Sequence, residues 1–356
     1  MTSPQLMTED EKALLELAQS GNERAYESLI EGHRAELHAH CYRMLASVHD
    51  ADDAVQEALF RAWKGLPSFE SRSSIRTWLF RIATNSSFDL LKKRKRRELP
   101  ISVGHRAAPG DSPGNPLFAD SWIEPYPDRL VSDEKSPEAR YEARESLELA
   151  FVSAIQYLPP RQRAVLILRE VLCFSALQVA ELLDTSVAAV NSSLQRARAN
   201  LADRLPSESQ HAELQRLGSV RAQELARRYV DAIDQGDVES LMSILTADAK
   251  WSMPPHPNYY EGRTAVEEFH RRDVSSVRWR HRITTANGQL AVGCYVYDEQ
   301  RGAYVATVLD VLDLRDGLVA EVTAFFTVHA FEEGESQGYV AAVDFERFGL
   351  PEALKD

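Results

Sequence analysis

Apolar residues in the first hundred positions recur every three or four residues, the period of an α-helix that is buried on one face. Two stripes stand out: Tyr26, Leu29, Ile30, Leu37, Cys41, Met44 and Leu45, and then Val55, Ala58, Leu59, Ala62, Trp63 and Leu66. Thr8 and Glu11 have the spacing of a capping box at the start of the first helix. We therefore expect residues 8–97 to form consecutive helices.

A second helical region, 138–205, contains two short amphipathic helices separated by a break at 184–186. Ser175 and Gln178 have capping-box spacing. The apolar stripes are Ala176, Val179, Ala180 and Leu183, and then Val187, Val190, Leu194 and Ala197. This pattern predicts a helix-turn-helix, which places its second helix in the DNA major groove. The alternative is an ordinary helical hairpin with a solvated face, which the basic end of the second helix disfavours.

The period changes in the last third of the chain. Helices are predicted first, over 220–235, 238–245 and 263–272, and four strand-like runs follow, over 277–285, 289–297, 304–314 and 318–329. Asn287-Gly288 and Asp316-Gly317 are hairpin signals because both dipeptides tolerate positive φ. The pattern predicts an α+β domain with a curved antiparallel sheet.

Two segments join these regions. Residues 98–137 are rich in Pro, Gly, Ser and Asp and are predicted to be a linker, and 206–210 is predicted to be a short polar joint. Trp122 and Pro125 belong to a Trp/Pro-containing stretch of the linker, which suggests a docking peptide. The alternative is an incidental apolar contact.

The net charge of −13 is unusual for a DNA-binding protein. However, residues 92–97 are six consecutive basic residues, and DNA responds to the potential within about 8–10 Å. The chain has no long apolar run and starts with polar residues, so we expect no membrane span and a cytoplasmic location. Cys41, Cys173 and Cys294 are far apart, so no metal site is expected.

Residues 50–66 and 73–97, followed by the helix-turn-helix, resemble the extracytoplasmic-function (ECF) sigma factors, which are sigma-70-type initiation subunits of bacterial RNA polymerase. The resemblance covers about the first 205 residues. It implies two all-α domains, sigma region 2 at 8–97 and sigma region 4 at 138–205, and two partners, the RNA polymerase core and promoter DNA. Residues 217–350 resemble a SnoaL-like domain, an α+β cone with a pocket between its helices and its curved sheet.

The resemblance assigns roles to individual residues. Asp53, Gln56 and Glu57 match the pattern with which sigma factors bind the clamp helices of the largest polymerase subunit, although a solvated helix face would look similar. The residues expected to contact the −10 promoter element are Phe69, Ser71, Arg72, Arg76, Trp78, Asn85, Lys92, Lys93 and Arg96. For Trp78, core packing is an equal alternative. Those expected to contact the −35 element are Ser186, Asn191, Ser192, Gln195, Arg196 and Arg198.

The C-terminal domain offers candidate pocket residues but no catalytic motif. The candidates are Trp251, Met253, His256, Tyr259, Tyr260, Phe269, Trp279, Tyr295, Phe325 and His329, and Asp310 could form an acid/base pair with His329. We predict a sigma factor with no catalytic residues and no cofactor, whose activity is modulated when 217–350 docks near the linker. A small ligand in the pocket is left open. The alternative is a promoter-binding fusion whose C-terminal domain is a small-molecule sensor or an enzyme.

Overall fold

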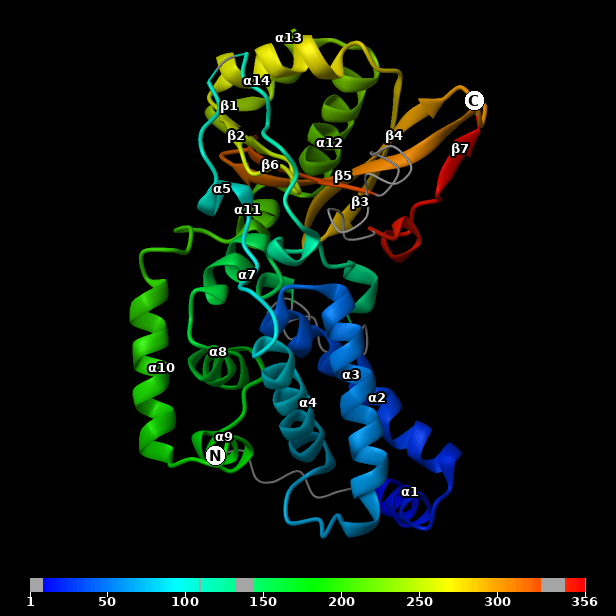
Figure 1. The fold of residues 1–356 in the computed structure, drawn as a ribbon, viewed down its shortest axis with the longest axis vertical. Coiled ribbons are helices and arrows are strands. Elements are labelled where there is room, and N and C mark those ends of the chain that lie inside the picture. The colour runs from blue at the N-terminus through cyan, green and yellow to red at the C-terminus, as the bar shows by residue number, and fades with distance from the viewer. Residues whose placement is uncertain (1–8, 109, 132–143, 328–342, 356) are drawn as a thin grey trace. The chain divides into compact units, whose positions relative to one another are not determined.

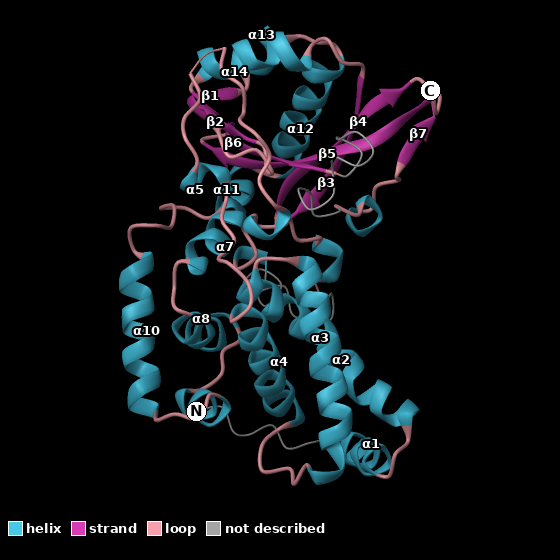
Figure 2. Cartoon of the chain, in the orientation of Figure 1, coloured by secondary structure: helices cyan, strands magenta, loops and turns pink. Residues whose placement is uncertain are grey.

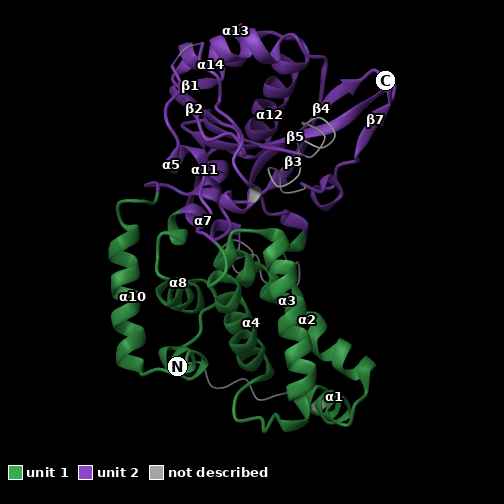
Figure 3. Cartoon of the chain, viewed as in Figure 1, with its two compact units in different colours: residues 1–94, 130–135, 154–205 green, residues 95–129, 136–153, 206–356 purple. Residues whose placement is uncertain are grey.

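The computed structural model describes residues 9–108, 110–131, 144–327 and 343–355 (Figure 1). The chain forms two compact units (Figure 3). Unit 1 comprises residues 1–94, 130–135 and 154–205, and unit 2 comprises 95–129, 136–153 and 206–356. The predicted linker therefore belongs mainly to the same unit as the C-terminal domain.

The first part of unit 1 consists of the predicted consecutive helices: α1 Glu9–Gln19, α2 Glu23–Leu45, α3 Val48–Gly65 and α4 Ile75–Leu91. The side chains of Asn22, Ser47 and Ser74 cap α2, α3 and α4 by accepting a backbone N–H. The predicted stripes of α2 and α3 are buried except Trp63, which is half-buried. Thr8 lies outside the described residues.

The second part of unit 1 contains the helix-turn-helix. Its helices are α8 Pro160–Leu166, α9 Ala176–Leu182 and α10 Val187–Leu201, and α7 Leu149–Gln156 precedes them. The capping box of Ser175 and Gln178 is present as predicted. Buried Arg163 donates to the carbonyls of Ile155 (3.0 Å) and Met44. Gln156 donates to the Arg43 carbonyl at 3.1 Å, so these two side chains join the segment before α8 to the end of α2.

Unit 2 is an α+β domain built on a seven-stranded sheet (Figure 2). Its strands are β1 Leu245–Ser252, β2 Tyr259–Glu261, β3 Trp279–Ala286, β4 Gln289–Asp298, β5 Ala303–Arg315, β6 Leu318–Phe326 and β7 Ala353–Lys355. The order is β2-β1-β6-β5-β4-β3, with β7 paired to β5. Its helices are α11 Gln210–Leu217, α12 Ser219–Asp234, α13 Val238–Ser243 and α14 Arg263–Phe269, and a π-helical turn, His270–Val274, follows α14.

The four predicted strands correspond to β3–β6, and both predicted hairpin turns have positive φ at Asn287 and Asp316. The short strands β1, β2 and β7 were not predicted. The β1–β6 pair is parallel, whereas the other strand pairs described are antiparallel. Helix α11 was also missed, because Ser209, read as part of a polar joint, is the cap of this helix.

The core of unit 2 lies between α12 and the sheet. Leu225, Tyr229 and Ile233 of α12 belong to the same buried cluster as Val292 and Leu312 of the sheet. The linker contributes the short helix α5 Pro100–Val103 and 3₁₀ turns at Ala119–Ser121 and Asp128–Leu130. This arrangement places linker backbone next to the sheet domain.

Candidate functional site

The predicted polymerase-binding residues share one exposed face of α3. Asp53, Gln56 and Glu57 are all exposed, whereas Val55 on the other face is buried. Glu57 pairs with Arg61 at 2.6 Å, one helical turn along. The face therefore presents two carboxylates and an amide that a partner can reach.

The residues expected to contact the −10 element divide into exposed and buried groups. Phe69 and Trp78 are 9% and 8% exposed, and their ring centroids lie 4.8 Å apart, so both rings belong to the helical core. Ser71, Arg72 and Asn85 are exposed. Because the aromatic pair is buried, the side chains that DNA can reach here are the polar ones of the loop before α4 and of α4 itself.

Arg76, another predicted promoter contact, is engaged inside unit 1. Its guanidinium makes two 2.9 Å contacts with the Glu36 carboxylate and donates to the Leu172 carbonyl at 3.3 Å. It also lies over the ring of Phe174, 4.3 Å from the centroid. A DNA contact by Arg76 would have to replace these interactions.

Basic side chains follow α4. Lys92, Lys93 and Arg96 are exposed, as a role at phosphates requires. Lys92 pairs with Asp89 at 3.1 Å, and Arg96 donates from Nε to Glu98 at 2.8 Å. No described residue pairs with the ammonium group of Lys93.

The basic run is not uniformly accessible. Arg97 is 6% exposed, donates to the Trp122 carbonyl at 2.8 Å and pairs with Glu124 at 3.5 Å. Arg94 pairs with Asp50 at 3.2 Å. Arg97 is therefore a buried contact of the linker, unlike the exposed Lys92, Lys93 and Arg96.

The outer face of α10 carries the predicted −35 contacts. Ser186, Asn191, Ser192, Gln195, Arg196 and Arg198 are all exposed. Arg198 pairs with Glu170 at 2.7 Å, whereas Arg196 donates to the Ser192 hydroxyl at 2.8 Å. Val190, Leu194 and Ala197 are buried on the opposite face, as predicted, whereas Val187 of the predicted stripe is exposed.

Residues 104–108 and 110–117 of the linker run beside β2 and the loop that precedes it. Backbone hydrogen bonds join Ala107 to Tyr259 (2.8 Å), Asn258 to Pro113 (3.1 Å) and Leu117 to Pro255 (2.9 Å). Gly104 lies so close to the loop that a Cβ there would meet the Pro257 carbonyl oxygen at 1.6 Å. The close approach requires glycine.

The β3–β4 turn binds backbone of the linker and of the segment just before α7. The Asn287 side chain accepts from the Tyr126 N–H at 2.8 Å and donates to the Leu147 carbonyl at 2.7 Å. The next residue, Gly288, donates its N–H to the Asp128 carboxylate at 2.8 Å. Trp122 is 5% exposed, and Pro125 is buried in the same stretch.

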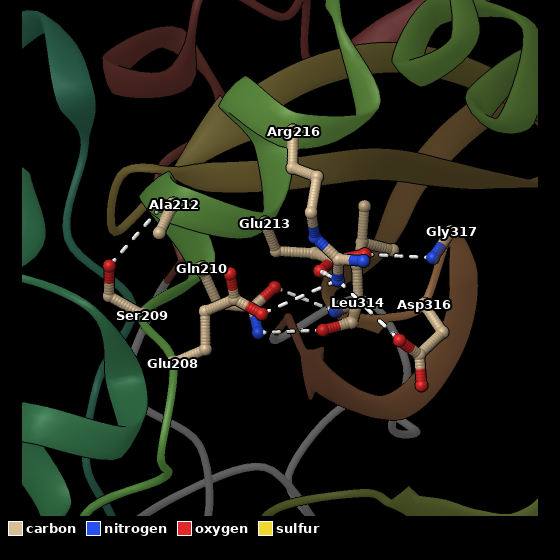
Figure 4. Close-up of polar contacts among 9 residues, drawn as sticks. All are labelled: Glu208, Ser209, Gln210, Ala212, Glu213, Arg216, Leu314, Asp316 and Gly317. Carbon is tan, nitrogen blue, oxygen red and sulfur yellow. Dashed lines mark hydrogen bonds and ion pairs between the residues drawn. The ribbon is translucent and has the colours of Figure 1, made fainter.

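The β5–β6 turn holds α11 in a similar way (Figure 4). The Gln210 amide donates to the Leu314 carbonyl at 3.0 Å and accepts from its N–H at 2.6 Å. Glu213 accepts from the Gly317 N–H at 2.7 Å. Glu148 caps α11 by accepting from the Gln210 N–H at 3.0 Å, and burial raises the pKa of its carboxyl to about 7.

The sheet domain encloses a cavity of about 540 Å³. Five of the predicted pocket residues line it: Trp251, Met253, His256, Phe269 and Trp279. Asp310 also lines it, but its proposed partner His329 lies outside the described residues. The periodicity did not indicate His270, His281, Arg272 and Cys294, which also line it.

Comparison with known families assigns all three parts of the chain. The Sigma-70 region 2 model matches residues 29–97, the Sigma-70 region 4 model matches 148–201, and the SnoaL-like domain model matches 226–322. The ECF RNA polymerase sigma factor SigG of Mycobacterium tuberculosis is 40% identical over 330 residues, which are 91% of this chain and 83% of SigG. The chain belongs to the ECF sigma factors.

Two further comparisons agree with this family. SigW of Bacillus subtilis, also an ECF RNA polymerase sigma factor, is 29% identical over 196 residues, 54% of this chain and 96% of SigW. The crystal structure of the ECF sigma factor SigJ of Mycobacterium tuberculosis has a TM-score of 0.55, covering 91% of this chain and 99% of SigJ at 20% identity. That structure supports the fold, helical sigma domains followed by a SnoaL-like domain.

As an ECF sigma factor with a fused SnoaL-like domain, this chain functions in promoter-directed transcription initiation. No described helix is long and apolar enough to cross a membrane. Among the described residues, no cluster of three His, Cys, Asp or Glu side chains could hold a metal ion.

Proposed function

We propose that this sigma factor binds the polymerase core through Asp53, Gln56 and Glu57 and contacts promoter DNA through two separate surfaces. In this proposal 8–97 contains the −10 surface, made of the loop before α4, Asn85, and the exposed basic residues after α4. Residues 138–205 contain the −35 surface, the outer face of α10. Both roles follow the family pattern and the exposure of these side chains, and we expect the protein in the cytoplasm beside its polymerase.

We further propose that the SnoaL-like domain modulates this activity by holding the linker. The observation that carries this proposal is a pair of hydrogen bonds made by the Asn287 side chain, which we call the Asn287 clamp. Asn287 binds the backbone of Tyr126 and of Leu147, two points far apart in the chain before the sheet. Trp122 and Pro125 lie buried between the end of α4 and this clamp. The docked linker restricts how far the two promoter-binding regions can separate.

Tethering favours this mode of control. Linker and domain belong to one chain, so their effective concentration reaches the millimolar range and a weak interface stays populated. The interface is built from backbone hydrogen bonds and from buried side-chain to backbone pairs such as Asn287–Tyr126. Breaking one partner of such a pair leaves the other buried and unsatisfied, which costs about 1–3 kcal/mol.

The SnoaL-like domain acts by binding rather than by catalysis in this proposal. SigG, which is 40% identical over 91% of this chain, is named as a sigma factor. Inside the cavity the Asp310 carboxylate accepts from Tyr229 and Cys294, so it is held as a structural acceptor.

Run-off transcription with purified core polymerase tests the modulation. The variant Asn287→Gly keeps the left-handed turn and removes the clamp, and Asp316→Gly makes the same change in the other hairpin, where the side chain only approaches Arg216 at 3.6 Å. We expect Asn287→Gly to change transcript yield by about fivefold or more and Asp316→Gly to leave it unchanged. Equal yields from wild type and Asn287→Gly would contradict the proposal.

A further inference from the structure

The cavity of unit 2 has the size and lining of a small-molecule site. Its volume of about 540 Å³ falls inside the range of about 300–1,000 Å³ that is usual for ligand pockets. Most of its wall is apolar: Ile233, Trp251, Met253, Phe269, Val274, Trp279, Val308, Ala324 and Phe326. The aromatic side chains come from strands β1, β3 and β6 and from helix α14, which the fold brings together around one space.

Polar side chains also line the cavity, among them Asp310, Cys294 and His281. The Asp310 carboxylate is 4% exposed, and its Oδ2 accepts from the Tyr229 hydroxyl at 2.8 Å and from the Cys294 thiol at 3.3 Å. No described residue donates to its Oδ1. His281, also on the wall, is 3% exposed and contacts Asp234 through Nδ1 at 2.6 Å.

His270 has a buried ring nitrogen without a hydrogen-bond partner among the described residues, which is an independent indication of a ligand. It lines the cavity and is 2% exposed, and its Nε2 has no hydrogen-bond partner among the described residues. Its ring lies edge-on to Trp251, 4.4 Å between centroids. Burial lowers the pKa of His270 to about 3, so its ring is neutral and can pair with an uncharged group.

The linker forms the remaining part of the wall. Gly110, Ser112 and Pro113 line the cavity, although they lie far from the other lining residues in sequence. Arg272, itself a lining residue, donates to the Gly110 carbonyl at 2.6 Å and to the Asp111 carbonyl at 3.1 Å. A ligand in the cavity would therefore touch the segment whose docking the proposed function invokes.

We propose that the cavity binds a neutral, largely apolar ring compound that carries one hydroxyl group, and that this ligand and the docked linker stabilise each other. This inference rests on the proposed function, in which docking of the linker modulates transcription. A hydroxyl can donate to the Asp310 carboxylate and accept or donate at a neutral histidine, whereas the apolar wall excludes charged groups through their desolvation cost. Because linkage is reciprocal, a ligand that contacts the docked linker must raise the population of the docked state.

The test uses the full chain and a matched pair of probes, 2-naphthol and naphthalene, which differ by one hydroxyl group. Fluorescence titration measures affinity, and hydrogen exchange follows the amides of residues 110–117 with and without 2-naphthol. We expect 2-naphthol to bind about tenfold more tightly than naphthalene. We also expect Asp310→Asn to reduce that preference and Ala324→Leu, which fills the space, to abolish binding of both probes.

A variant of the arginine that holds the linker measures the coupling. Arg272→Ala should weaken 2-naphthol binding about fivefold or more, and 2-naphthol should slow exchange at 110–117 in the wild type. The proposal would be overturned if neither probe bound. It would also be overturned if 2-naphthol bound without slowing exchange at 110–117 and bound Arg272→Ala as tightly as wild type. Failure of the proposed function would be seen separately. In that case the transcript yield without any probe would be the same for wild type and Asn287→Gly.

Discussion

The outer face of α10 and the Asn287 turn recognise partners in opposite ways. Arg196 and Arg198 extend into solvent from a helix whose other face is buried, so they are accessible to a separate molecule. Asn287 is fully buried, with 0% exposure, and satisfies backbone groups of its own chain. In the proposed function, the first surface contacts promoter DNA and the second holds the linker.

The largest expected effect concerns a third surface, the α3 face, which resembles α10 in being exposed. Replacing Asp53, Gln56 and Glu57 with Ala together should weaken polymerase binding by about 2–4 kcal/mol, the range of interface hot spots. Fluorescence anisotropy with labelled sigma factor measures this affinity. The control is Glu23→Ala with Glu27→Ala, which removes two exposed carboxylates from α2. Equal affinities in both variants would place the polymerase contact elsewhere.

On the α10 side, Arg196→Ala should cost about 1–3 kcal/mol of promoter affinity if the side chain contacts a base. Arg198→Ala should cost less, because Arg198 must first leave Glu170, with which it pairs at 2.7 Å. Electrophoretic mobility shifts of polymerase complexes measure both, and Glu170→Ala should tighten binding by releasing Arg198. A weaker complex with Glu170→Ala would mean that the pair orients Arg198 productively.

Neutralising Lys92 and Lys93 should act differently from the α10 changes. For each phosphate that is no longer neutralised, the salt dependence of DNA binding should flatten by about 0.7–0.9 in log–log slope, with little change in sequence preference. Arg97→Gln serves as the contrast, because its buried side chain should leave the slope alone and loosen the linker instead. If neutralising Lys92 and Lys93 left the salt dependence unchanged, these residues would not contact DNA phosphates.

A pH-dependent effect on stability is expected at Glu148, which caps α11. Because burial raises its pKa to about 7, the folded state binds a proton more tightly than the unfolded state. Stability from this group therefore falls as pH rises from about 4.5 to 7, by roughly 1–3 kcal/mol. Glu148→Gln should flatten that part of the pH dependence in chemical denaturation, and an unchanged profile would refute the assignment.

Periodicity predicted the parts of the molecule whose contacts are local. The stripes of α2, α3 and α10, and the turns at Asn287 and Asp316, follow from spacing and backbone preference alone. It could not predict that Asn287 binds backbone about 160 residues earlier in the chain, because such a contact has no periodic signature. For the same reason it could not predict that Arg97, at the end of the basic run, is buried against the linker.

Short strands also escaped prediction. Strands β2 and β7 are three residues long, too short for alternation to be recognised. Strand β1 begins at Leu245, where the predicted helix 238–245 ends, and its other residues had no predicted element. Without them, neither the parallel β1–β6 pair nor the linker contacts beside β2 could be predicted. Aromatic residues of the pocket were recognisable, but His270 became apparent only through its unpartnered Nε2.

Hydrogen exchange on the full-length chain tests most directly the claim that the SnoaL-like domain holds the linker. The amides to follow are those of residues 121–128, compared between wild type, Asn287→Gly and Asp316→Gly. The account predicts protection in wild type and in Asp316→Gly, and at least about fivefold faster exchange in Asn287→Gly, equivalent to the loss of about 1 kcal/mol of docking free energy. Identical exchange in all three proteins would contradict it.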